Sequence, residues 1–228
     1  MSKKPAQDME SFLKHQDSTT LVNVLTELAA EHPNVRNRLV RLSLADRTDE
    51  LAAEFRKLLT RWRRSKKKFF TRSGAREFGQ ELQDWLDQVE AALLDKNPRA
   101  ALALFESFIE LDATWFEMAD DSDGSIGYAV MAACVYWLQA AKRCGSPSDK
   151  WPDRIEILYL ADRYGARDEL LRRADLLFDE TGLRQLVNRF EGLQTGAQAF
   201  NPKVPRWQYE NYKMSAAIKL LSKAASSH

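Results

Sequence analysis

The sequence predicts an all-α protein, and two observations carry this prediction. The chain of 228 residues contains 57 Leu and Ala residues against 14 Val and Ile residues, and Leu and Ala favour helices whereas β-branched residues favour strands. Apolar residues also recur every three or four positions along most of the chain, which is the period of a helix. We therefore expect helical hairpins packed as an α-solenoid-like domain, in the manner of tetratricopeptide or HEAT arrays, or as a bundle.

The first elements are four apolar stripes at helical spacing. Ser18 is expected to cap the first helix, Pro33 to open the second and Ser73 to cap the fourth. Short connections between the stripes favour antiparallel hairpins. The four stripes span residues 21–28, 35–42, 51–62 and 78–93.

The next two elements differ, because they are apolar over more than one face of the helix. Such helices are buried, so residues 102–116 and 126–138 are expected to form the central core. Gly145, Gly165, Gly182 and Gly192 lie near the ends of helices and are expected to act as left-handed C-caps. The later, shorter helices are expected at residues 153–164, 167–179 and 181–191.

The predicted organisation is a helical array over residues 1–191, a loop or linker over 192–206, and a C-terminal helix over 207–228 that packs on the array. The linker is expected because 192–206 contains two glycines and two prolines with little periodicity. One internal echo, Leu-Ser-Leu-Ala-Asp-Arg at 42–47 and Leu-Tyr-Leu-Ala-Asp-Arg at 158–163, indicates either a divergent repeat of helix pairs or a chance match. No tetratricopeptide or ankyrin consensus is present.

A basic run with interleaved aromatic residues is the strongest local signal. Cations bind phosphates and aromatic rings stack on bases, so this composition can suit nucleic acid. The alternative is that Trp62 and Phe69 are core residues and that the cations form a solvated helix end, where they complement the helix dipole. The run places seven positive charges in twelve residues: Arg61, Arg63, Arg64, Lys66, Lys67, Lys68 and Arg72.

The net charge of +1 conceals two opposed blocks. Residues 31–76 contain 14 Lys and Arg against 5 Asp and Glu, whereas residues 77–123 contain 2 against 13. The simpler interpretation is that neighbouring basic and acidic faces attract each other and help to order the helices. The functional interpretation is that each block attracts a different partner. The acidic block also disfavours nucleic acid, because it repels a long phosphate chain.

An acidic turn at residues 119–124 resembles a calcium loop at first sight. With Gly124 at the sixth position, the twelfth position is Val130 instead of the bidentate Glu that such loops require. The simpler interpretation is that Asp123 or Ser125 caps the following helix. Asp120, Asp121 and Asp123 therefore remain weak candidate metal ligands, and we expect no metal and no cofactor.

The sequence lacks the motifs of several common metal, nucleotide and hydrolase sites. Three scattered histidines and two cysteines do not form a zinc set, and the phosphate-binding glycine loops and the nucleophile elbow are absent. Two free thiols, no apolar leader and no long apolar stretch predict a cytoplasmic protein without a membrane span. An enzyme stays among the hypotheses, because distant residues can assemble a site.

The run Ala-Asp-Asp-Ser-Asp-Gly-Ser-Ile-Gly at residues 119–127 resembles an acidic turn in a family of uncharacterised bacterial all-helical proteins. Related domains accompany SWIM-type zinc fingers. The likeness covers residues 18–190 and includes a basic helix end near 61–72, although only the acidic turn is specific. It implies a solenoid-like fold in a bacterial cytoplasm, with no assigned catalytic residues. This chain lacks the zinc-finger ligands, so no zinc role follows from the resemblance.

We expect an uncharacterised helical scaffold that binds another protein through a groove or a charged face. Nucleic-acid binding through residues 61–72 is the alternative, and an enzyme without a recognisable motif is the third hypothesis. The sequence names neither the partner nor the oligomeric state.

Overall fold

The computed structural model describes residues 4–64, 69–145, 150–198 and 205–225, with the backbone alone described for 4–8, 196–198 and 205–211. Within these ranges every regular element is a helix, and β-type pairing is limited to an isolated bridge between Phe70 and Ala119. The predicted all-α class is therefore confirmed. None of the described helices combines the length and the apolar composition that crossing a bilayer requires.

The chain divides into two compact units, residues 1–51 and 52–228. The first unit contains α1 (Lys4–Lys14), α2 (Ser18–Glu31), α3 (Pro33–Ser43) and the first residues of α4 (Thr48–Arg64). The sequence did not predict α1. Asp17, and not the expected Ser18, caps α2, because its carboxylate accepts the Thr20 N–H at 2.9 Å. Pro33 opens α3 as expected.

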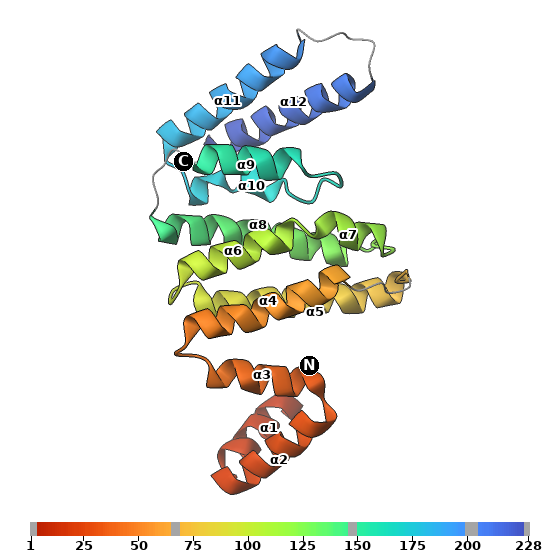
Figure 1. Cartoon of the computed structure of the whole chain (residues 1–228), viewed down its shortest axis with the longest axis vertical. Helices are drawn as coiled ribbons and strands as arrows, with labels where there is room; N and C mark the ends of the chain where they lie inside the picture. Colours follow the sequence, from red (N-terminus) through yellow and green to blue (C-terminus); the bar gives the residue numbers. More distant parts are fainter. Residues whose placement is uncertain (1–3, 65–68, 146–149, 199–204, 226–228) are drawn as a thin grey trace. The chain divides into compact units, whose positions relative to one another are not determined.

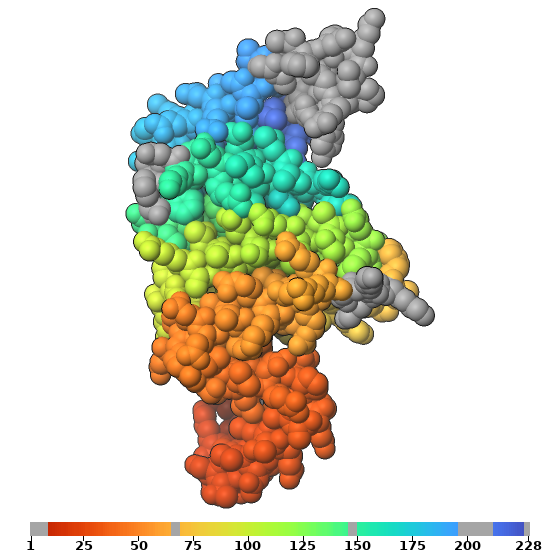
Figure 2. Space-filling view, viewed as in Figure 1, coloured from red at the N-terminus to blue at the C-terminus, as the bar shows by residue number. Residues whose placement is uncertain are grey.

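The second unit continues as pairs of helices, which Figure 1 shows as α4 beside α5, α6 with α8, α9 with α10, and α11 beside α12. Contacts join α5 and α6 to α8, and α10 to both α8 and α12. In the space-filling view, side chains close the spaces between the ribbons of α6, α8 and α9 (Figure 2). The elements after α4 are α5 (Arg72–Leu93), α6 (Pro98–Ile109), α7 (Asp112–Glu117), α8 (Ser125–Cys144), α9 (Trp151–Leu160), α10 (Glu169–Arg172), the 3-10 helix η1 (Ala174–Leu176), α11 (Glu180–Gln198) and α12 (Pro205–Ala225).

A cluster of aromatic rings forms the core between α4, α5 and α7. Phe55 packs edge-on against Trp85 at 5.8 Å between centroids, while Trp62 packs against Phe78 at 5.9 Å. This pairing requires α4 and α5 to run antiparallel. Trp115 of α7 contacts both Trp62 and Phe78 at 6.2 Å. All five side chains are buried, and aromatic side chains bury more apolar area each than smaller residues do.

The two stretches predicted as core helices are buried in the structure. Residues 102–116 lie in α6 and α7, and residues 126–138 lie in α8. Helix α8 buries side chains from Ile126 to Ala141. A close approach positions α8 against α5. A Cβ atom added to Gly79 would lie 2.7 Å from the Cβ of Ser125, so the crossing requires glycine at residue 79.

The predicted boundaries fail in the last third of the chain. Helix α11 continues to Gln198, so residues 192–198 of the expected 192–206 linker are helical. Gly145 is the left-handed C-cap of α8, and Gly165 also has a positive φ, as expected. Gly182 and Gly192 lie inside α11 without positive φ, and they are not the expected C-caps. Buried residues on one face of α11, among them Leu186 and Phe190, outweigh the low helix propensity of glycine. The expected helix 167–179 is reduced to the short α10 and η1.

Candidate binding surfaces

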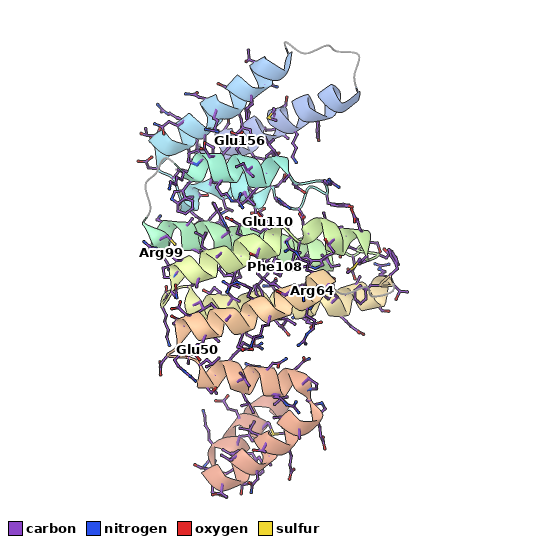
Figure 3. The ribbon with its side chains drawn as sticks, viewed as in Figure 1. Glu50, Arg64, Arg99, Phe108, Glu110 and Glu156 are labelled. Carbon is purple, nitrogen blue, oxygen red and sulfur yellow. The ribbon has the colours of Figure 1, made fainter. Side chains whose placement is uncertain are left out.

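Four exposed arginines form a cluster at the junction of α4 and α5. Arg61, Arg63 and Arg64 end α4, and Arg72 begins α5. Trp62 points into the core between them, which turns its neighbours outward, and Figure 3 labels Arg64 at the end of α4. Within the described residues, none of these four guanidinium groups forms an ion pair or a hydrogen bond. We refer to them as the α4–α5 arginine cluster. The other predicted members of the basic run, Lys66, Lys67 and Lys68, lie outside the described residues.

An exposed phenylalanine lies three residues before Arg72 on an anchored segment. The N–H of Phe70 donates to the Met118 carbonyl at 2.8 Å, and the Asp120 N–H donates to the Phe70 carbonyl at 2.9 Å. The Phe70 ring stacks on Phe78 at 5.2 Å. Side chains alternate along an extended segment, so Phe69 points away from the core and is 62% exposed. The expectation that Phe69 belongs to the core is therefore wrong, whereas the burial expected of Trp62 is confirmed.

The acidic turn supports the N-terminus of α8. The two carboxylate oxygens of Asp121 accept the N–H groups of Ile126 and Gly127 at 2.8 and 3.0 Å. Asp123 accepts the hydroxyl and the N–H of Ser125, at 2.7 and 3.2 Å. These hydrogen bonds, together with Arg76, lower the pKa of Asp123. The sequence indicated Asp123 or Ser125 as the cap, but Asp121 makes the bonds to the first turn.

The weak metal candidates have other partners in this turn. Asp120 accepts the Ser122 N–H at 3.2 Å, and the oxygens of Asp121 and Asp123 face the N–H and hydroxyl groups described above. Among the residues that the structure describes, no three His, Cys, Asp or Glu side chains gather as ligands for a metal ion. The arrangement of this turn therefore supports helix capping.

The described ion pairs connect the acidic block chiefly to arginines that follow it in the sequence. Asp95 pairs with Arg143 at 2.8 Å, and Glu106 pairs with Arg154 at 2.6 Å. The two opposed blocks meet at one described ion pair, between Arg76 and Asp123 at 3.0 Å. Pairing between the blocks therefore does not neutralise the α4–α5 arginine cluster.

A buried ion pair that the sequence did not suggest joins α7 to the segment before α10. Arg167 donates both Nε and Nη2 to the Asp112 carboxylate at 2.8 Å, and both side chains are almost fully buried. Arg167 also donates to the carbonyls of Leu158 and Ile109. Burial opposes the charge of Arg167, but the hydrogen bonds and attraction of Asp112 prevail and raise its pKa. All partners are internal, so the pair has a structural role.

Cys134 and Lys213 also have shifted pKa values near this ion pair, and both shifts have structural explanations. Burial raises the pKa of the Cys134 thiol far above its usual range, so the reactive thiolate is disfavoured. Burial lowers the pKa of Lys213. Its ammonium donates to the carbonyl of Leu160, the last residue of α9, and to that of Asp162, two residues further on. These bonds place α12 against α9, and they do not expose a base to substrate.

The surface of the second unit has two described hollows. One of about 350 Å³ lies between α7 and α9, and its lining includes Glu117, Ile157 and Arg163. Another of about 790 Å³ lies beside the start of α11, and its lining includes Lys142 and Asp179. Each lining contains a threonine among carboxylates, Thr181 in the larger hollow and Thr114 in the smaller. Within the described residues, neither hydroxyl forms the hydrogen bond to a base that activates a nucleophile. Neither hollow therefore advances the enzyme hypothesis.

The first unit exposes apolar side chains along two helices. No residue of α2 or α3 is buried, and Phe12 and Val22 are 59% and 60% exposed. The sequence predicted the stripe on α2 but gave no sign that it is uncovered. We call these side chains, together with the half-buried Leu21, the N-terminal apolar stripes, namely Met9, Phe12 and Leu13 on α1, and Leu21, Val22, Val24, Leu25 and Leu28 on α2.

Comparison with known proteins assigns no activity. A family model described as a family of unknown function, DUF6880, matches residues 10–227. No curated protein and no solved structure matches the chain. The match agrees with the resemblance to an uncharacterised family, whereas bacterial origin and the association with SWIM-type zinc fingers stay predictions.

Proposed function

Since the chain belongs to the DUF6880 family of unknown function, we propose from its surfaces that it is a helical module that binds another protein. The N-terminal apolar stripes are the proposed docking face. The observation that carries the proposal is that α2 and α3 bury no residue while α2 presents five apolar side chains on one side. Large exposed apolar patches mark interaction sites.

The spacing of the stripe supports a docking role. Leu21, Leu25 and Leu28 are three or four residues apart, so they share one face of α2, and Val22 and Val24 flank them. Asn23 and Thr26 lie on the opposite, polar face. Covering one Leu or Val side chain contributes about 1.5–3 kcal/mol. A partner that covers this face therefore gains a substantial apolar contribution.

The charges of α2 specify the occupant that we propose. Its polar positions include Glu27 and Glu31, and it contains no Lys or Arg. An amphipathic helix that binds a membrane surface usually carries Lys and Arg on its polar face, so α2 does not suit an anionic bilayer. Pairing of two α2 helices would bring acidic residues together without a base from either helix.

The proposed partner is therefore an amphipathic helix of another protein, with an apolar stripe flanked by Lys or Arg. Helices bind grooves and helix faces through anchors at a spacing of three and four residues. The stripe of α2 has this spacing, and Met9 of α1 adds an adaptable apolar side chain. Basic residues on the partner would pair with Glu27 and Glu31.

Site-specific photocrosslinking in the cells that make the protein tests this proposal. A photoreactive residue at Leu25 faces the stripe, and the same residue at Asn23 is the matched control on the polar face of α2. We expect crosslinks to another protein from position 25 only, mapped to a helix with Lys or Arg beside its apolar residues. Glu27→Lys should lower the yield several-fold, because it reverses the flanking charge.

Three results would overturn the proposal. Equal crosslinking from positions 23 and 25 would indicate unspecific encounter. Crosslinks from position 25 to residues 52–228 of the same chain would mean that the protein covers its own stripe. Crosslinks to a second copy of the chain would replace partner binding by self-association.

A further inference from the structure

We propose that the α4–α5 arginine cluster, together with Phe69, binds a short stretch of single-stranded nucleic acid. The cluster contacts the phosphates, and the Phe69 ring stacks on a base. This site belongs to the second unit and is independent of the N-terminal apolar stripes.

The four arginines of the cluster supply exposed positive charge that no described acid neutralises. Many arginines elsewhere in this unit are paired, as Arg154 is with Glu106 and Arg189 with Asp153. Arg56, Arg99 and Arg163 are also exposed without a described ion-pair partner, but they lie at separate places along the chain. Arg61, Arg63, Arg64 and Arg72 are exposed, and the structure gives them no partner among the described residues. A guanidinium group binds phosphate through two parallel hydrogen bonds. Four such groups at one junction leave a concentrated positive charge for an external anion.

The start of α5 adds a second set of donors for anions. The N-terminus of an α-helix leaves its first N–H groups without intrahelical partners. Thr71 occupies the N-cap position of α5, but its side chain makes no capping hydrogen bond. The positive dipole end of this 22-residue helix therefore lies at Arg72, its first residue. Its hydroxyl neighbours, Thr71 and Ser73, can donate further hydrogen bonds.

Phe69 distinguishes nucleic acid from other anions. Its ring is 62% exposed, yet its backbone is held because Phe70 pairs with Met118 and Asp120. An exposed ring in a fixed place beside arginines is the arrangement in which bases stack on proteins that bind single strands. An acidic peptide would use the arginines but has no base to place on the ring. A duplex keeps its bases stacked internally.

The neighbouring acids limit the length of the bound strand. Met118 and Asp120 lie against Phe70, and Glu117 and Asp120 are exposed. These carboxylates repel phosphates that run past the cluster. The site therefore suits a few nucleotides and opposes a long track along α5, whose exposed residues include Glu81 and Asp87.

Fluorescence anisotropy on the purified protein tests the site. The probe is a labelled oligothymidine of about a dozen nucleotides, with the matching duplex and a poly-glutamate peptide as competitors. We expect affinity that falls steeply as salt rises. Changing Arg61, Arg63 and Arg64 to Ala should make the slope of log K against log salt shallower by about 2, since each phosphate contact on a single strand contributes about 0.7. Phe69→Ala should weaken binding about 5- to 100-fold, and Phe69→Trp should retain it.

The matched control changes Arg172, Arg173 and Arg184 to Ala, which removes the same charge from arginines that pair on the surface of this unit. It should leave both the slope and the affinity unchanged, and circular dichroism should be the same for all variants. Absence of binding at low salt would overturn the proposal. So would equal loss in the two triple variants, or poly-glutamate binding as tight as the oligothymidine together with no effect of Phe69→Ala.

Discussion

Helices α2 and α8 have nearly the same average hydrophobicity but differ in how much of their surface is buried. Helix α8 buries side chains along most of its length, between α5 and α6 on one side and α10 on the other. Helix α2 buries none. The difference shows that an apolar stripe predicts that a helix face will be buried. It does not predict whether the same chain or a partner buries it. In the second unit, other helices of the protein bury α8. In the first unit, we propose that a partner protein buries α2.

The largest effect is expected at the buried ion pair of the covered unit. Arg167→Met leaves Asp112 as a buried charge without its partner, so it should lower the free energy of unfolding by about 3–5 kcal/mol. Replacing both residues, as Asp112→Leu with Arg167→Met, should recover part of this loss. The carbonyls of Leu158 and Ile109 still lose a donor, at about 1–3 kcal/mol. Urea unfolding of the two variants measures the difference.

The same experiment can contradict the structural role of this pair. If Arg167→Met unfolds at the same urea concentration as the wild type, the pair is not buried in solution. If the double variant is less stable than Arg167→Met, the unpaired Asp112 carboxylate does not destabilise the single variant.

A smaller effect is expected at the acidic turn. Asp121→Ala removes the acceptor of two N–H groups in the first turn of α8, and loss of such a cap costs about 0.5–2 kcal/mol. Asp120→Ala is the control, since it removes one bond outside the helix. Its effect should stay within about 0.5 kcal/mol. Thermal unfolding of both variants checks the prediction, and equal effects would mean that Asp121 is not the cap.

The smallest effect is expected on the uncovered stripe. Leu25→Gln changes an exposed side chain, so the purified protein should lose less than about 0.5 kcal/mol of stability. The matched change in the covered unit, Leu86→Gln, removes a fully buried leucine. It should cost several times as much, since it combines lost apolar burial with a buried amide. Similar losses at the two positions would mean that α2 is covered within the protein.

The sequence allowed the helices to be predicted where the apolar period is strong, as in α5 and α8. It failed where tertiary packing overrides local preference, as at Gly182 and Gly192, which α11 tolerates because its other face is buried. Helix α1 was missed. The stretch before Ser18 has few apolar residues, and Met9, Phe12 and Leu13 give only about one turn of helical spacing.

The candidate sites were less predictable for a different reason. The basic run was visible in the sequence, but whether its arginines are paired depends on distant residues. The composition suggested that the acidic block neutralises the run, yet Asp95 and Glu106 pair with Arg143 and Arg154. Asp112 and Arg167 lie 55 positions apart, so no local spacing could connect them. Protein binding, nucleic-acid binding and a cytoplasmic location stay predictions.

The exposure of the N-terminal apolar stripes is the claim on which the proposed function depends, and carbene labelling of the purified protein tests it most directly. Labelling resolved by residue should be strong at Phe12, Leu25 and Leu28 and weak at Phe108 and Trp115, which are fully buried. That result would leave the stripes free for a partner. Labelling at Leu25 and Leu28 as weak as at Trp115 would contradict the account, because the chain or a second copy of it would already cover α2.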